Sequence, residues 1–224
     1  MADTPLARLE SEVTARLADR RLMAVVTVKD AAQAAPLAAA LQRGGIDTVE
    51  VTFRTPAAAQ VIALIASELP GFMVAAGTVI EPAQADIAKA AGARFAVTPG
   101  LDEAVVRRCH EVGLPVFPGV LTPTEVQAAL RLGCKTLKVF PIEPMGGVAV
   151  LKVLSGPYGP AGVRFMPTGG ITVATMASYL EVPAVLSVGG TWIAPPDLVD
   201  AGAWGQIERR AAEAVSIAKA SGRA

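Results

Sequence analysis

A lysine lies in the middle of a segment that otherwise has the composition of a buried β-strand. The segment is TLKVF, residues 136–140, and Pro141 follows it directly. Successive side chains of a strand point to opposite faces, so Leu137 and Val139 share an apolar face and Lys138 lies on the other. If the apolar face packs against helices, the ammonium group of Lys138 points into the interior of the sheet.

A glutamate occupies an equivalent position in an earlier strand-like segment, DTVEVTF, residues 47–53. Val49 and Val51 are expected to pack against helices, which leaves Glu50 facing inward. An isolated buried charge is strongly unfavourable, so the two inward charges require either each other or a function.

Two interpretations of this pair are open. The first is a structural ion pair that joins the two strands. The second is catalysis, because a desolvated lysine is a nucleophile that forms a Schiff base with a carbonyl carbon. A neighbouring carboxylate can then move the protons that such chemistry requires.

Four further polar side chains directly follow predicted strands: Arg54, Thr78, Thr168 and Thr191, after the second, third, seventh and eighth strands. Enzymes built on (β/α)₈ barrels place their sites at this end of the strands. Arg54 could hold a substrate carboxylate through two parallel hydrogen bonds. The alternative for Arg54 is a solvated loop arginine.

Paired glycines occur in the loops after the last two predicted strands. The loops are TGGI, residues 168–171, and GGTW, residues 189–192, and each leads toward a helical segment. Glycines there allow backbone N–H groups to approach an anion at a helix N-terminus, in the usual phosphate position of such barrels. Tight strand-to-helix turns also use glycine, so the two pairs together carry more weight than either alone.

The segments that position these side chains alternate between helix-like and strand-like patterns. TPTEVQAALRLG, residues 122–133, has a threonine N-cap, a proline, Glu125 three residues after the cap and a closing glycine, which predicts a helix. Gly92, Gly113 and Gly133 close successive helices, 21 and 20 residues apart, and each precedes a strand. The eight strand-like segments are LMAVVTV (22–28), DTVEVTF (47–53), FMVAAG (72–77), RFAVT (94–98), PVFPG (115–119), TLKVF (136–140), RFMPT (164–168) and AVLSVGG (184–190).

This alternation predicts an α/β fold in which parallel strands are joined by right-handed crossovers, and eight units in 224 residues fit a (β/α)₈ TIM barrel. A doubly wound open sheet is the alternative, although no GxGxxG follows the first strand. We expect one domain over residues 1–224: an extra N-terminal helix across the barrel bottom (1–20), the barrel core (21–203) and a C-terminal helix (204–220).

Composition narrows the classes of partner. Twenty Lys and Arg balance twenty Asp and Glu, so a nucleic-acid or polybasic membrane contact is not expected. The N-terminus lacks an apolar signal core and no segment is apolar over the ~18 residues of a membrane span, which predicts a cytoplasmic protein. His110 is the only histidine and is expected on the surface, so a metal site built on several histidines is excluded. Cys109 and Cys134 have no CxxC spacing and are interpreted as packing residues.

Six motifs, in order along residues 20–192, resemble the 2-keto-3-deoxy-6-phosphogluconate (KDPG) and 4-hydroxy-2-oxoglutarate (KHG) aldolase family. The motifs are VEVTFRT (49–55), AAGTV (75–79), VTPG (97–100), LKVFPIEPMGG (137–147), RFMPTGGI (164–171) and SVGGTW (187–192). The resemblance implies a class I lyase that reversibly cleaves KDPG to pyruvate and glyceraldehyde 3-phosphate in the Entner–Doudoroff pathway. It also implies a homotrimer and a reaction that needs no metal or organic cofactor.

The resemblance also implies roles for matching positions. Lys138 would be the Schiff-base lysine and Glu50 the proton shuttle, with Arg54 and Thr78 holding the keto-acid carboxylate. Further positions would line the pyruvyl pocket (Pro99 and Phe140) or bind the distal phosphate (Gly169, Gly170, Gly190 and Thr191).

The chain also departs from the family pattern. Many relatives carry an arginine near the end of the first strand, where this sequence has Thr27, and Met23 and Ala24 replace a proline-containing pattern. Thr168 in PTGG resembles the gluconate-type enzymes more than the galactonate-type ones.

Three alternatives to a KDPG aldolase stay open. One is an aldolase for 2-keto-3-deoxy-6-phosphogalactonate or 4-hydroxy-2-oxoglutarate. Another is a phosphate-binding barrel isomerase or decarboxylase that forms no imine, and the third is a non-catalytic protein that binds a sugar phosphate.

Overall fold

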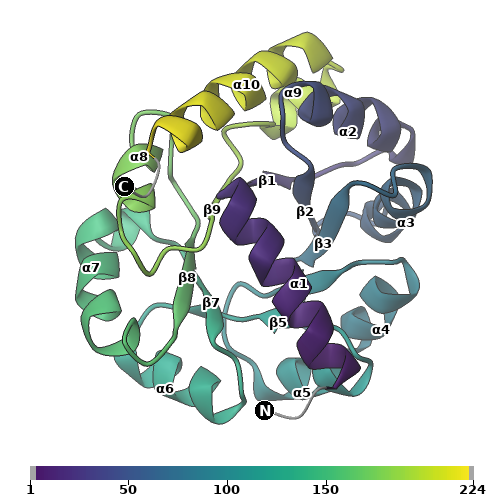
Figure 1. Ribbon diagram of the computed structural model, residues 1–224. Helices are drawn as coiled ribbons and strands as arrows, with labels where there is room; N and C mark the ends of the chain where they lie inside the picture. Colours follow the sequence, from purple (N-terminus) through teal and green to yellow (C-terminus); the bar gives the residue numbers. More distant parts are fainter. Residues whose placement is uncertain (1–3, 222–224) are drawn as a thin grey trace.

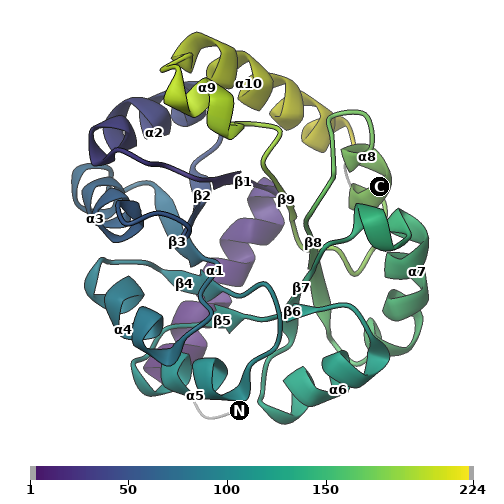
Figure 2. The ribbon, with the colours of Figure 1, turned by 180° about the vertical axis from the view of Figure 1, so that it is seen from behind.

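The computed structural model describes residues 4–221 and places the strands at the centre of a ring of helices (Figures 1 and 2). The strands form two parallel sheets, with the orders β5-β4-β3-β2-β1-β9 and β6-β7-β8. The predicted α/β fold of parallel strands is confirmed, and the parallel sheets are curled (Figure 1). The strands are β1 Leu22–Val26, β2 Thr48–Thr52, β3 Met73–Gly77, β4 Phe95–Val97, β5 Val116–Phe117, β6 Gly119–Val120, β7 Thr136–Val139, β8 Arg164–Pro167 and β9 Val188–Gly190.

The prediction of one continuous strand over 115–119 is wrong. Val116 pairs with Ala96 of β4, whereas Gly119 pairs with Lys138 of β7, and Pro118 lies between the two short strands. Proline has no N–H to donate to a ladder, so pairing is interrupted there. The chain therefore passes from one sheet to the other at Pro118.

The eighth predicted strand, 184–190, forms a regular ladder only over β9. Upstream of it, Val185 makes a single parallel bridge to Phe165, and Thr168 makes another to Gly189. These two bridges connect β8 of the smaller sheet with the segment that contains β9 of the larger one.

Helices follow most strands and cover the outside of the sheets (Figure 1). The helix predicted over 122–133 is α6, and Thr122 and Glu125 form the expected capping box at its start. The predicted terminal helix, 204–220, is α10. The α-helices are α1 Pro5–Arg20, α2 Ala34–Arg43, α3 Ala58–Glu68, α4 Pro82–Ala90, α5 Glu103–Glu111, α6 Pro123–Arg131, α7 Gly147–Tyr158, α8 Met176–Leu180, α9 Pro196–Asp200 and α10 Trp204–Ala220; Ala31–Gln33 and Glu143–Met145 are short 3₁₀ helices.

Helix α1, Pro5–Arg20, runs diagonally across one end of the strands (Figure 1). The predicted N-terminal helix was 1–20, of which residues 1–3 lie outside the described part of the chain. The α1 side chains Val13 and Leu17 are fully buried in an apolar cluster inside the curled sheets. The strands contribute Met23, Met73, Ala75, Phe95, Val97, Phe117 and Met166 to this interior cluster, and Leu186 joins it from the segment before β9.

A second apolar cluster lies between the sheets and the outer helices. Leu137 and Val139 belong to it, which confirms that Lys138 faces the other way. Cys109 and Cys134 are buried there as free thiols, as expected of packing residues, and burial raises the pKa of each to about 12. His110, predicted on the surface, is half-buried on α5, and burial, with the charge of Arg107, lowers its pKa.

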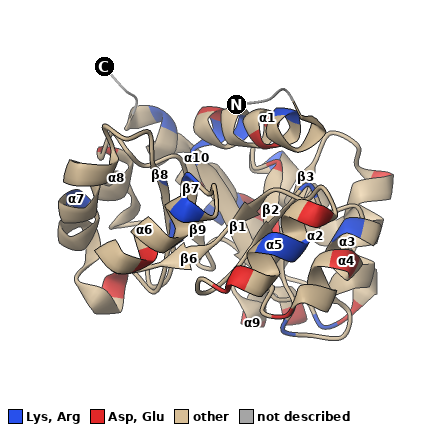
Figure 3. Cartoon of the chain, turned by 90° about the horizontal axis from the view of Figure 1, so that it is seen from below, with Lys and Arg blue, Asp and Glu red and all other residues tan. Residues whose placement is uncertain are grey.

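Charged residues of both signs are spread over the helices, in keeping with the balanced composition (Figure 3). Among residues 4–221 no helix is long and apolar enough to cross a membrane. The same residues contain no group of three or more His, Cys, Asp or Glu side chains that could hold a metal ion.

We predict that Leu17→Ala lowers the free energy of unfolding by about 2–5 kcal/mol, because it leaves a cavity where α1 packs into the interior cluster. Chemical denaturation monitored by circular dichroism measures the change. Ala18→Ser, at an exposed position of the same helix, is the control and should have little effect. A loss below about 1 kcal/mol for Leu17→Ala would mean that α1 contributes little to the core.

Candidate active site

Lys138 and Glu50 meet inside the fold although 88 residues separate them in the chain. The Nζ atom of Lys138 lies 3.2 Å from Oε1 of Glu50, and their side chains are only 7% and 1% exposed. Lys138 lies on β7 of the smaller sheet and Glu50 on β2 of the larger sheet. The predicted inward orientation of both charges is therefore confirmed.

The second carboxylate oxygen of Glu50, Oε2, is buried and has no hydrogen-bond partner within residues 4–221. A buried carboxylate oxygen normally accepts a hydrogen bond, from the protein or from water. Lys138 is also held from a second side, since its Nζ lies 5.1 Å from the centre of the Phe140 ring, within reach of a cation–π interaction. Oε1 of Glu50 is therefore paired with Lys138, and Oε2 can accept a hydrogen bond from a ligand or a water.

The pair opens into a cavity of about 250 Å³ at the carboxyl ends of the strands. All but two of the residues predicted to form the site line it. These are Glu50, Arg54, Lys138, Phe140, Thr168, Gly169, Gly170, Gly190 and Thr191, and the remaining lining residues are Val25, Thr52 and Ile171.

Thr78 and Pro99 do not line this cavity. Thr78 directly follows β3, Pro99 lies two residues after β4, and both are half-buried. The backbone of Thr78 is left-handed, with φ 57°, which is rare for a β-branched residue and indicates local strain. Pro99 is approached closely by β6, because an ideal Cβ on Gly119 would lie 2.3 Å from the Pro99 carbonyl oxygen.

The first glycine pair is held in place by the segment after β7. Gly169 and Gly170 both have positive φ, 100° and 86°, which favours glycine. Ile142 donates its N–H to the Thr168 carbonyl, and Glu143 donates to the Gly169 carbonyl, each at 3.0 Å. The loop that carries the pair is thus fixed against the segment that follows the lysine.

The second glycine pair is adjacent to the first, because Thr168 and Gly189 are bridge partners. Each pair leads toward a helix, as predicted, but α8 begins only at Met176 and α9 at Pro196. Intervening turn residues separate the glycines from both helices. An anion in the cavity would therefore meet loop N–H groups and hydroxyls first.

Sequence reasoning missed Val25, Thr52 and Ile171 as lining residues. Thr52 lies two residues after Glu50 on β2, so strand alternation also points its side chain inward. Its hydroxyl lies 2.9 Å from that of Thr27 and donates to the Val26 carbonyl at 3.1 Å. The same two-residue alternation along β1, from Met23 to Val25, could have identified Val25.

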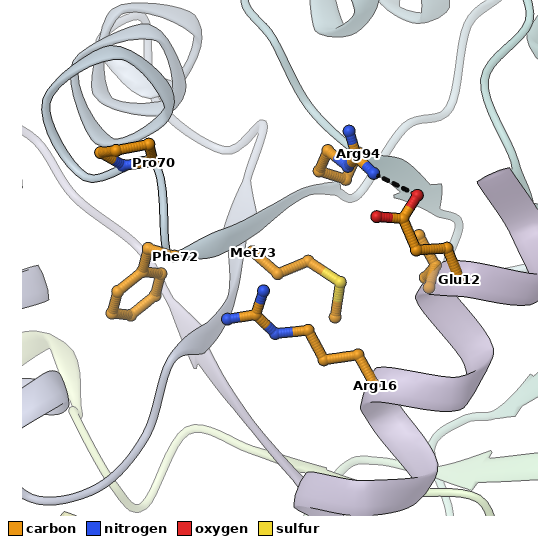
Figure 4. A pocket seen from close by; sticks show the side chains of 7 residues that line it. Glu12, Arg16, Pro70, Phe72, Met73 and Arg94 are labelled. Atoms are coloured by element: carbon orange, nitrogen blue, oxygen red, sulfur yellow. Dashed lines mark hydrogen bonds and ion pairs between the residues drawn. The ribbon is translucent and has the colours of Figure 1, made fainter.

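Another cavity, of about 210 Å³, lies beside α1 and contains none of the predicted site residues (Figure 4). Its two guanidinium groups are paired with carboxylates. Arg94 contacts Glu12 at 2.8 Å, and Arg16 contacts Asp47 at 2.9 Å. The charges of these arginines are therefore already compensated. The cavity around Lys138 is the candidate active site.

Comparison with known proteins gives the same family from sequence and from structure. The family model for KDPG and KHG aldolases matches residues 13–210. The 2-dehydro-3-deoxy-phosphogluconate aldolase of Treponema pallidum is 42% identical over 197 residues, covering 88% of this chain and 93% of the relative. The KHG/KDPG aldolase of Escherichia coli K12 is 42% identical over 195 residues, covering 87% and 91%.

A solved structure of KDPG aldolase from Legionella pneumophila, with pyruvate captured as a covalent carbinolamine intermediate, superposes with a TM-score of 0.84. It is 37% identical in sequence, and the match covers 89% of this chain and 96% of that protein. With the family model spanning most of the chain and relatives above 40% identity, the chain belongs to the KDPG and KHG aldolase family.

Proposed function

We propose that this protein is a class I aldolase that reversibly cleaves 2-keto-3-deoxy-6-phosphogluconate to pyruvate and glyceraldehyde 3-phosphate. The observation that carries the proposal is the buried contact of 3.2 Å between Lys138 and Glu50 at the wall of a cavity. Family membership supports it, because relatives with more than 40% identity are named for this activity. A purely structural ion pair would not require an adjoining cavity lined by hydroxyls and glycines.

In the proposed mechanism the free amine of Lys138 attacks the C2 ketone of the substrate. The resulting carbinolamine loses water and becomes an iminium ion, which withdraws electrons from the neighbouring carbon. The low exposure of Lys138 favours this step, because little bulk water competes for the amine. The apolar Phe140 ring beside Nζ would line the pyruvyl pocket. The family resemblance assigns Pro99 to the same pocket, although Pro99 does not line the cavity.

Glu50 would carry the protons, either directly or through one water. It accepts the C4 hydroxyl proton as the C3–C4 bond breaks, and glyceraldehyde 3-phosphate leaves. The electron pair of that bond forms an enamine on Lys138. Glu50 then returns the proton to C3, and hydrolysis of the imine releases pyruvate. The unpartnered Oε2 is the oxygen available for this transfer.

The remaining cavity residues divide between the two ends of the substrate. Arg54, exposed at the cavity, would bind the keto-acid carboxylate. The family resemblance assigns Thr78 to the same carboxylate, although Thr78 does not line the cavity. Gly169, Gly170, Gly190 and Thr191 would bind the distal phosphate through N–H groups and a hydroxyl, beside Thr168. This division requires no metal or organic cofactor.

We also propose that residues 1–224 are one domain in which the two sheets close into a (β/α)₈ barrel. The bridges between β8 and the β9 segment support closure, and α1 would be the extra helix that covers the barrel bottom. A homotrimer, a cytoplasmic location and a role in the Entner–Doudoroff pathway follow from the family resemblance alone. A phosphorylated keto acid would be the partner, without nucleic acid or membrane.

A second candidate substrate is 4-hydroxy-2-oxoglutarate, because the E. coli relative is named a KHG/KDPG aldolase. Both substrates present the same 2-keto acid end to Lys138, and they differ at the end that would meet the glycine loops. A galactonate-type substrate would differ from KDPG only in configuration at C4. An isomerase or decarboxylase that forms no imine is the competing mechanism.

We predict that pyruvate and borohydride leave a stable pyruvyl adduct on Lys138, which peptide mass spectrometry can locate. Lys138→Arg is expected to abolish both the adduct and nearly all turnover, because a guanidinium group cannot form the imine. Lys135→Arg, at an exposed position three residues earlier, is the control and should keep both. A folded, pyruvate-binding protein that gives no adduct would rule out the Schiff-base mechanism, and substantial activity of Lys138→Arg would favour a reaction without an imine.

Thr191→Val is expected to raise the KM for KDPG about tenfold, because it removes one hydrogen bond to a charged phosphate at nearly constant side-chain volume. Adduct formation from pyruvate, which has no phosphate, should be unchanged. Steady-state kinetics and borohydride trapping measure the two effects. Equal weakening of both reactions would place Thr191 at the keto-acid end of the substrate.

Thr78→Gly and Thr78→Ala are expected to differ in stability but to share a loss of pyruvate binding. Glycine relieves the left-handed backbone, whose strain is about 1–2 kcal/mol for a side-chain-bearing residue, and should raise the melting temperature. Alanine keeps the strain and lacks the hydroxyl. If both variants bind pyruvate as tightly as the wild-type chain, Thr78 does not hold the carboxylate.

A further inference from the structure

Gly77 is the last residue of β3, the strand next to the one that carries Glu50. Met73 and Ala75 belong to the interior cluster, whereas Val74 and Ala76 belong to the outer one. A side chain at position 77 would therefore point into the interior. The inward row of β3 shrinks from methionine to alanine to glycine as it approaches the cavity.

The carboxylate of Glu50 occupies the space that a side chain at position 77 would need. An ideal Cβ on Gly77 would lie 2.3 Å from Oε1 of Glu50, 2.4 Å from Cγ and 2.7 Å from Cδ. Real Cβ atoms essentially never come within 3.0 Å of such atoms. Any side chain at position 77 would therefore displace the carboxylate.

Backbone conformation does not explain this glycine. Gly77 lies in a regular parallel ladder opposite Thr52 and is absent from the residues with positive φ. Other amino acids could adopt its conformation, as Ala75 and Ala76 do on the same strand. What position 77 supplies is the missing Cβ.

The oxygen that a Cβ at position 77 would strike is the same Oε1 that contacts Lys138 at 3.2 Å. We propose that Gly77 is a positioning residue: because it has no side chain, the Glu50 carboxylate can occupy the space from which it reaches Lys138 and a substrate bound there. This inference rests on the proposed role of Glu50 in proton transfer.

Other glycines near the site make room for different groups. An ideal Cβ on Gly119 would meet the carbonyl of Pro99, and one on Gly190 would meet the ring of Trp192. Among the glycines of residues 4–221, only Gly77 has Glu50 among the atoms nearest to its ideal Cβ, and none has Lys138. The steric relation is therefore specific to this pair of residues.

The test is a double-mutant cycle that combines Gly77→Ala with Glu50→Ala. In the wild-type background, Gly77→Ala is expected to lower kcat for KDPG cleavage about 100-fold, the contribution of a misplaced acid–base group. It should also lower the melting temperature, while the borohydride adduct of pyruvate on Lys138 still forms. Gly71→Ala is the matched control: it precedes the same strand, has no heavy atom within 4 Å of its ideal Cβ, and should leave kcat unchanged.

In the Glu50→Ala background, Gly77→Ala should lower neither kcat nor the melting temperature further, because the group it displaces is gone. Equal losses in both backgrounds would overturn the proposal. The melting-temperature part of the cycle does not depend on activity, so it remains informative if the wild-type protein forms no adduct. In that case the proposed function fails, while a stability effect that vanishes with Glu50→Ala still supports the packing of Gly77 against Glu50.

Discussion

The contact between the Lys138 ammonium group and the Glu50 carboxylate is the constraint on which the rest of the site depends. Each charge is almost fully buried, and removing one partner would leave the other uncompensated, typically at a cost of about 3–5 kcal/mol. The two strands that carry them belong to different sheets. The curvature of both sheets must therefore place β2 and β7 opposite each other, so that the Nζ and Oε1 atoms at the ends of the two side chains lie 3.2 Å apart.

The interior of the sheets is apolar at one end and polar at the other. At one end, α1 inserts Val13 and Leu17 among apolar strand residues, and the rings of Phe95 and Phe117 pack with their centres 5.0 Å apart. At the other end the inward positions become threonine, glutamate, lysine and glycine. The apolar half is buried from water, and the polar half adjoins the cavity. A close-packed floor beneath the charges restricts their movement.

Two-residue alternation was sufficient to predict from sequence that Lys138 and Glu50 face inward, because valine and leucine on the opposite faces left no other choice. It could not supply their separation, which depends on the curvature of two sheets. The split at Pro118 was visible as a proline within a strand pattern, but the transfer between sheets follows from pairing partners far away in sequence. Thr78 and Pro99 follow strands at the expected end, yet they do not line the cavity. Their positions depend on the conformations of the loops, which sequence periodicity does not determine. Gly77 illustrates the same limit: a glycine in AAGTV is recognisable, but the atom it accommodates is known only from coordinates.

The order of the larger sheet has a consequence for the synthesis of this protein. Its first strand, β1, pairs with its last, β9, so the ladder that begins at Leu22 is completed only by Val188–Gly190. A chain emerging from the ribosome exposes the unpaired edge of β1 until nearly all of the sequence has been made. Glu50 is likewise without its lysine partner until residue 138 appears. Such long-range pairing is slow to form, so this strand edge is open to aggregation until late in translation.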